Sequence, residues 1–312
     1  AFLASRRIRH TGGLAPAEAR ALLAETGAAA ALISSVELHE DSESPKVALT
    51  ARLVSTGDVP TVLWMDSVAL AADDAPGFLG LGLVRDVRIL RDRAIGGLAD
   101  GVAARLERGG APGARTGDRP RAERRFRPRS FHRSPGADPA GSGPVRVAVM
   151  PFRSDVARAD AGALVALQFV RRLAASPGVE VLEPGVVREV LLRARLVQSE
   201  GISLPQADLL RELLDADVVV AGRVDDWRDA PGTGTVPHVS FTAQGIDTRT
   251  RRVVWTATTG HRGDRGVFFF GARLVRTANA LAAEMALAVV ARAVPGPGGG
   301  AGGVPAPADG VR

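Results

Sequence analysis

The feature that most constrains the fold of this chain is a sequence pattern that occurs twice. Residues 21–40 read as the end of a helix followed by a strand, and residues 212–227 read the same way, with Ala28 matching Ala216. Further along, residues 49–64 align with residues 241–255, and Trp64 matches Trp255 when one gap is placed in the turn. Matches in the same order over several elements predict an internal duplication, that is, two copies of one folding unit.

The second copy is complete, and its elements follow from residue patterns. Residues 145–152 and 217–224 are apolar on both faces, which predicts strands buried on both sides, and residues 179–184 predict a third strand. Residues 238–260 alternate and turn at 247–251, which predicts a β-hairpin. Helices are expected at 160–175, 186–197, 204–214 and 271–293. The prediction is an α/β fold with two tandem domains, each a mixed sheet with a C-terminal antiparallel hairpin flanked by helices.

The domain boundaries follow from composition. We expect a first copy at 1–106, a linker rich in Arg, Pro and Gly at 107–144, a complete second copy at 145–294, and a disordered Gly/Pro tail at 295–312. The first copy lacks counterparts of residues 145–189. We infer that these lie upstream of Ala1, so that the first copy is N-terminally truncated. The rival interpretation is a permanently incomplete copy whose open sheet edge is filled by a partner.

The positive charge of the chain is concentrated in the linker. Residues 107–135 hold nine arginines against three acidic residues, which accounts for the formal net charge of +6. Five arginines around Phe126 are candidates for contact with an anionic surface: Arg121, Arg124, Arg125, Arg127 and Arg129. The alternative is a solvated tether without a binding role. In both cases the sequence predicts that the excess positive charge lies in a linker and not on the surface of a folded domain.

Composition excludes several classes of protein. There is no cysteine, so disulfides, thiolate metal sites and cysteine nucleophiles are excluded. No apolar run approaches the roughly 18 residues of a membrane-spanning helix. Hydrophobic residues at 46% and charged residues at 24% are typical of a soluble globular protein.

The second copy resembles a known superfamily. The order of "VAVMPF", "LLDADVVVAGRV", the hairpin "DTRTRRVVW" and a C-terminal amphipathic helix is similar to the bacterial envelope superfamily that includes CsgG of curli secretion, LpoB and the TolB N-terminal domain. The resemblance implies a non-enzymatic protein, lipid-anchored at the outer membrane, that acts by binding envelope partners or by assembling. Pore-forming members thread long hairpins into the membrane, whereas the loop at 226–237 is short and rich in Pro and Gly.

Two loops are candidate partner-contact surfaces. Phe268, Phe269 and Phe270 are consecutive, so they cannot all face inward on one regular element, and exposed aromatic residues mark contact surfaces. Phe78 and Leu79 lie at the corresponding place in the first copy. The alternative is that these residues pack under the following helix.

The chain offers little for catalysis or metal binding. The five histidines share no ligand spacing, phosphate-binding loops are absent, and the acidic residues at 37–43 lack the pattern of a calcium loop. Asp225 and Asp226, at a strand end, could form a carboxylate pair for acid–base work, but no nucleophile or histidine lies near them in sequence. We therefore expect no enzyme activity, no metal and no cofactor.

Two functions remain. The first is a non-catalytic, periplasmic and lipid-anchored envelope protein that binds envelope partners or itself. The second is a cytoplasmic nucleic-acid-binding protein that uses the Arg-rich linker and whose binding would fall steeply with salt. An enzyme acting through Asp225 and Asp226 is a third, weaker reading.

Overall fold

The computed structural model describes residues 13–74, 82–107, 124–135, 143–195, 204–230, 232, 235–266 and 274–294. Within these ranges it holds six helices and two sheets, so the fold is mixed α/β. The smaller sheet is antiparallel, in the order β1-β2-β3: β1 (Ala30–Glu40), β2 (Lys46–Ser55) and β3 (Val62–Ala71). Helix α2 (Pro16–Thr26) precedes it and α3 (Val87–Glu107) follows it.

The larger sheet has the order β4-β10-β9-β8-β5-β7. Its strands are β4 (Ser130–Arg133), β5 (Val145–Val149), β7 (Val179–Val181), β8 (Val218–Arg228), β9 (His238–Asp247) and β10 (Val253–Arg262). The short β6 (Arg153–Ser154) adds to the edge of β8. Helices α5 (Ala161–Ala174), α6 (Pro184–Arg193), α7 (Leu204–Leu214) and α8 (Ala278–Ala293) complete the fold. The strands β5 and β7 are parallel to their neighbours, and β8, β9, β10 and β4 form an antiparallel run.

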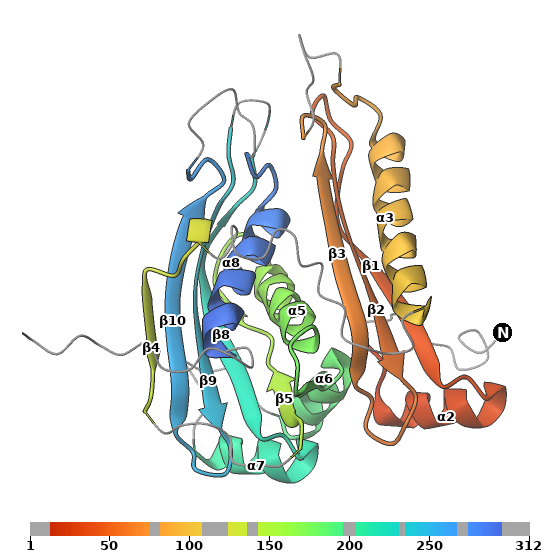
Figure 1. Cartoon of the computed structure of the whole chain (residues 1–312), viewed down its shortest axis with the longest axis vertical. Helices are drawn as coiled ribbons and strands as arrows, with labels where there is room; N and C mark the ends of the chain where they lie inside the picture. Colours follow the sequence, from red (N-terminus) through yellow and green to blue (C-terminus); the bar gives the residue numbers. More distant parts are fainter. Residues whose placement is uncertain are drawn as a thin grey trace, which may run out of the picture.

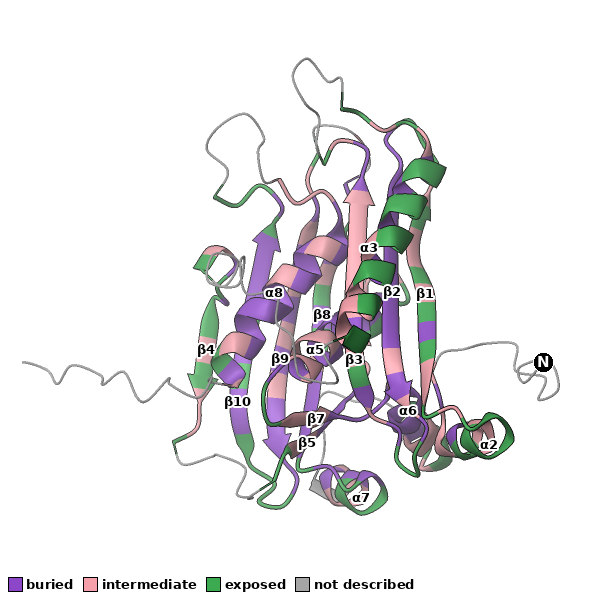
Figure 2. Cartoon of the chain, turned by 45° about the vertical axis from the view of Figure 1, so that its right-hand side comes forward, coloured by how far each residue is buried: buried purple, intermediate pink, exposed green. Residues whose placement is uncertain are grey.

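These elements form layers. Figure 1 shows α3 outermost, then the smaller sheet, then α5 and α8, then the larger sheet. On the far face of the larger sheet, Met150 and Val219 pack with Leu210 of α7 and Val187 of α6. Helices α5 and α8 therefore lie between two sheets, which is why Figure 2 shows α8 buried along most of its length while the outer sides of α3 and β1 are exposed.

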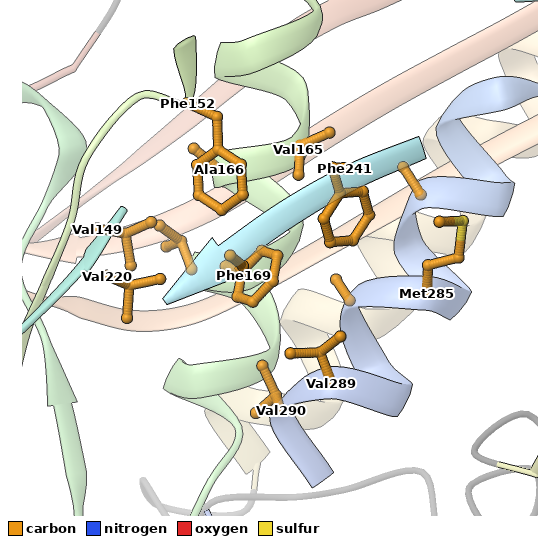
Figure 3. Close-up of a cluster of buried hydrophobic side chains, with 14 of the residues drawn as sticks. Val149, Phe152, Val165, Ala166, Phe169, Val220, Phe241, Met285, Val289 and Val290 are labelled. Atoms are coloured by element: carbon orange, nitrogen blue, oxygen red, sulfur yellow. The ribbon is translucent and has the colours of Figure 1, made fainter. Parts of the chain in front are cut away.

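The largest core lies between the larger sheet and helices α5 and α8. Figure 3 shows Phe152, Phe169 and Phe241 at its centre, with ring centroids of Phe152 and Phe169 5.2 Å apart and those of Phe169 and Phe241 5.8 Å apart. Gly222 makes room for this packing, because a Cβ there would lie 2.4 Å from the Phe152 ring. Aromatic residues are few in this chain, and three of them are gathered here, where their large side chains fill the centre of the core.

The two halves share this core rather than forming separate bodies. Val62 and Met65 of β3 belong to the same buried cluster as α5 and α8. Polar contacts also cross between the halves: Arg52 with Glu183, Arg171 with Asp66, Arg276 with Asp73, Lys46 Nζ with the Ala230 carbonyl, and Arg158 with the Glu37 carbonyl. The smaller sheet is consequently covered on both faces over β2.

Helix limits agree with the predicted ranges except where capping decides them. Helix α7 covers the predicted 204–214. Helix α6 begins at Pro184, two residues before the predicted start, because Glu183 is its N-cap and proline is favoured in the first turn. Helix α8 was expected from 271 but begins at Ala278, because the Thr277 hydroxyl accepts the Ala280 N–H at 3.1 Å and so caps the helix there.

Local geometry repeats between the two sheets. Glu37 in β1 and Asp225 in β8 are each the extra residue of a β-bulge, and the register around both bulges matches the sequence alignment. A second pair of bulges occurs at Leu63 and Val254. The aligned residues Thr56 and Thr248 also make equivalent side-chain hydrogen bonds.

The Thr56 hydroxyl donates to the Ala28 carbonyl at 2.6 Å, and the Thr248 hydroxyl donates to the Ala216 carbonyl at 2.5 Å. The order helix, three antiparallel strands, helix is thus common to α2-β1-β2-β3-α3 and α7-β8-β9-β10-α8.

Candidate functional site

Part of the predicted linker belongs to the folded domain. Residues 130–133 form β4, which pairs antiparallel with β10, with Trp255 opposite Arg133 and Ala257 opposite Phe131. Phe131 stacks on Trp255 with ring centroids 6.4 Å apart. The interpretation of residues 124–135 as tether was wrong, because two phenylalanines and a short alternating stretch supply enough apolar contact to order this segment.

Residues 124–129, here called the basic ledge, are fixed by the residues between the arginines. Phe126 is 1% exposed and meets the His261 ring edge-on at 5.6 Å. His261 Nε2 donates to the Arg127 carbonyl at 2.8 Å, since a carbonyl oxygen can only accept. Arg125 donates through Nε to the Arg265 carbonyl and through Nη2 to the Gly263 carbonyl, at 2.6 and 3.1 Å. The ledge is therefore bound to the end of β10.

The anchored backbone leaves three guanidinium groups in solvent. Arg124, Arg127 and Arg129 are exposed, whereas Arg125 is half-buried and serves as an anchor. Arg265 lies next to them, because its Nε donates to the Arg125 carbonyl at 3.0 Å. Sequence reasoning missed Arg265. Arg121 lies outside the described residues.

Burial of His261 lowers the pKa of its imidazole. The hydrogen bond to the Arg127 carbonyl opposes this shift, but the nearby positive charges of Arg265 and Arg129 reinforce it. The ring is therefore neutral at neutral pH, with its proton on Nε2. A protonated ring at this place would add another charge to an already basic surface.

The two predicted contact loops start from one place. Residues 75–81 and 267–273 lie outside the described residues, and with them Phe78, Leu79, Phe268, Phe269 and Phe270. The residues that flank these loops are described. Asp73 Oδ2 lies 2.9 Å from Arg276 Nη1, with side chains only 13% and 12% exposed.

The basic ledge joins the same place. The Gly263 carbonyl accepts both the Arg125 guanidinium and the Val275 N–H, the latter at 3.0 Å. One end of the molecule thus brings together the ledge and the bases of both loops, although in sequence these segments are up to about 200 residues apart. We call this the loop end.

The carboxylates that suggested acid–base chemistry are engaged in ion pairs. Asp225 pairs with Arg223 at 2.8 Å. Asp226 accepts from Arg228 at 3.0 Å and contacts His238 Nδ1 at 2.8 Å. Partial burial of Asp226 disfavours its charge, but the hydrogen bonds from His238 and Arg228 outweigh it and lower the pKa of the carboxyl. His238 lies on the next strand, so its proximity could not be read from sequence neighbours.

The remaining predictions concern tryptophan, metals and membranes. Trp255 is a core residue, 5% exposed, and Trp64 packs in the cluster between β2, β3 and α3, as predicted. Among the described residues, no group of three histidines or carboxylates lies close enough together to hold a metal ion. In the same part of the chain, no helix combines the length and apolarity needed to cross a bilayer.

Comparison with known proteins finds similarity to solved structures. No protein-family model and no curated protein sequence matches it. Solved structures do. They include a PelC dodecamer, a lipoprotein and an LpoB C-terminal domain.

Three of these neighbours illustrate the likeness. The PelC dodecamer from Paraburkholderia phytofirmans is 19% identical, over 53% of this chain and 96% of that one, with a TM-score of 0.36. Lipoprotein GNA1162 from Neisseria meningitidis is 20% identical over 38% and 81%, with a TM-score of 0.31. The LpoB C-terminal domain from Escherichia coli is 13% identical over 46% and 93%, with a TM-score of 0.28. LpoB was among the members named from the sequence pattern, whereas CsgG and TolB are not among these three.

Proposed function

We propose that this chain is a non-catalytic binding and assembly module of the bacterial cell envelope, and that its loop end is the contact surface. The observation that carries the proposal is that the bases of both loops and the basic ledge meet at one place. Asp73 and Arg276 tie the bases of both loops together, and Arg125 ties the basic ledge to the same place. A surface made from three separate segments points to one binding function rather than to two unrelated loops.

The basic ledge gives that surface a positive charge. Arg124, Arg127 and Arg129 are exposed on an ordered backbone, so little entropy is lost when they meet an anionic surface. We propose that the surface is anionic lipid on the periplasmic side of the envelope, and that a lipid anchor outside this sequence holds the protein there. The phenylalanines of the two loops would supply apolar contact with an envelope partner or with another copy.

The tandem arrangement is part of the proposal. Two bulges and one threonine hydrogen bond recur at aligned positions, which supports descent of both sheets from one unit. The absence of catalysis is proposed on other grounds. Asp225 and Asp226 are both paired with arginines, and the lowered pKa of the Asp226 carboxyl makes that group a poor base.

Binding to lipid vesicles tests the proposal. Vesicles containing phosphatidylglycerol should sediment with the protein, and vesicles of phosphatidylcholine alone should not. Replacing Arg124, Arg127 and Arg129 together by Gln should weaken binding by roughly a hundredfold, since each arginine near an anionic surface contributes about 1 kcal/mol. The matched control replaces three exposed arginines on α2, α6 and α7, namely Arg20, Arg188 and Arg211, and should bind as the wild type does.

Two results would count against it. Equal loss in both triple variants would mean that binding follows net charge and not the ledge. Tighter binding to single-stranded nucleic acid than to vesicles, with a log–log salt slope near the roughly −2 expected for three phosphate contacts, would favour the nucleic-acid alternative.

A further inference from the structure

Strand β1 is a long edge strand, and its outer side could form backbone hydrogen bonds with a further strand. Among the described residues, β1 pairs with β2 only. Its counterpart β8 carries β5 and β6 on that side, in parallel register at Val218, Val219 and Val220 and again further along. The matching positions on β1 are residues 30–32 and 35–36. Exposed edges are normally protected by charged side chains, proline or β-bulges, and residues 30–36 of β1 have none of these.

The face of β1 next to this edge is apolar and exposed. Leu32 and Val36 are 56% and 64% exposed. Their counterparts by register, Val220 and Val224, are 1% and 2% exposed because α5 covers them. The same two positions are thus apolar in both sheets, but only the larger sheet has a helix over them.

Helix α3 forms the wall of this exposed groove. It packs on β2 and β3, through Val87, Leu90, Ala94 and Leu98. Gly97 marks the side toward β3, because a Cβ there would lie 3.7 Å from Val68. At about 100° per residue, Ile95 lies on the opposite flank, toward β1, and it is 51% exposed.

The correspondence with the larger sheet indicates room for one helix beside α3. In the larger sheet, α8 occupies the place that α3 occupies here, and α5 lies beside it, against both α8 and β8. A helix placed against α3 and over β1 would cover Leu32, Val36 and Ile95 together. A strand leading into that helix would pair with the edge of β1.

We propose that β1 and this groove bind a strand–helix segment of a polypeptide partner, with its strand parallel to residues 30–36 and its helix over Leu32 and Val36. The required chemistry is that of residues 145–174, an apolar strand followed by a helix with a Leu, Val and Phe face. A second copy cannot supply it, because its own α5 is already covered by β3 and its β1 leads into a hairpin. The proposal deepens the proposed binding function by naming one partner element.

Binding of a defined probe tests this. The probe is residues 143–176 of this chain fused behind a soluble carrier protein, and the target is the full chain. We expect saturable binding and slower amide hydrogen exchange over residues 30–36. Val36→Arg and, separately, Ile95→Arg should weaken binding by at least about tenfold. Leu213→Arg is the control, because Leu213 is 50% exposed, close to the 51% of Ile95, but lies on α7, against the far face of the larger sheet.

The outcomes separate the possible occupants. No saturable binding, or binding unchanged by Val36→Arg in a variant with wild-type thermal stability, overturns the proposal. A dimer of the chain alone that Val36→Arg dissociates would assign the groove to a second copy, and vesicle binding lost in that variant would assign it to lipid; either result overturns it. The triple Gln variant of Arg124, Arg127 and Arg129 should keep full affinity for the probe, so failure at the ledge and failure at the groove are distinguishable.

Discussion

At the scale of single residues, the fold depends on one buried ion pair between its halves. Arg52 Nη2 and Nε contact the Glu183 carboxylate at 2.9 and 3.0 Å, and the two side chains are 4% and 0% exposed. Glu183 also accepts the Leu14 N–H at 3.2 Å. A buried pair of this kind contributes little compared with an apolar pair, but loss of one partner leaves a buried charge uncompensated.

Glu183→Gln should therefore lower the free energy of unfolding by about 3–5 kcal/mol, measured by urea denaturation. Adding Arg52→Met should recover most of that loss, because it removes the orphaned charge while Gln still accepts from Leu14. A double variant as unstable as the single one would show that the buried charge is not the cause. Asp264→Asn, at an exposed pair with Arg262, should cost under about 1 kcal/mol.

The buried His261 predicts a pH dependence. Its pKa is lowered in the folded protein, so below the unfolded value of about 6.5 the unfolded chain binds more protons than the folded one. The stabilisation from neutral His261 is complete above that pH and is lost as the pH falls. His261→Gln should reduce the loss of stability between a pH of about 7.5 and about 5, since Gln can still donate to Arg127. His132→Gln, at an exposed position of β4, should keep the wild-type profile.

At the scale of elements, β4 shows how an edge strand can be held by two aromatic residues. Its four residues form few ladder bonds, so Phe126 against His261 and Phe131 against Trp255 must supply the remaining stability. Arg133 and the neighbouring arginines of the ledge also protect this edge from pairing with other chains. The strand thus closes one side of the larger sheet and presents the ledge.

Phe126→Ala should release this segment. Removing a ring that is 1% exposed should cost about 3–5 kcal/mol and should accelerate trypsin cleavage after Arg124 and Arg129, identified by mass spectrometry of the fragments. His132→Ala, on the same strand but exposed, should leave the cleavage rate unchanged. Rapid cleavage of the wild type at both sites would mean that the ledge is a tether after all.

At the scale of the whole molecule, residue identity explains why the smaller sheet is covered on both faces over β2, whereas the far face of the larger sheet is exposed over β10. The back of the smaller sheet carries Ala48 and Met65, which are buried against the rest of the protein. The aligned positions of the larger sheet hold Ser240 and Thr256, and Thr256 is exposed. Small polar residues make that face stable in water, so the stack of layers ends there.

A shared helix layer predicts one cooperative transition. Since α5 packs on both sheets, unfolding of either sheet exposes the same core. Trp64→Phe leaves tryptophans only in the larger sheet, and Trp227→Phe with Trp255→Phe leaves only Trp64 in the smaller one. Within each variant, fluorescence and far-UV circular dichroism should give the same urea midpoint. Separate midpoints would show that the halves unfold independently.

The sequence by itself determined the helices, the hairpins and their correspondence between the halves, because these depend on periodicity, caps and turns within about 20 residues. Thr56 and Thr248 could be aligned before their hydrogen bonds were seen. Only the tertiary structure decided that β4 joins β10, that His238 meets Asp226, and that Asp73 meets Arg276. Pairings of this kind are set by how layers stack, which no local pattern encodes. The uncovered face of β1 is also a tertiary result, because within the described part of the chain no helix covers Leu32 and Val36.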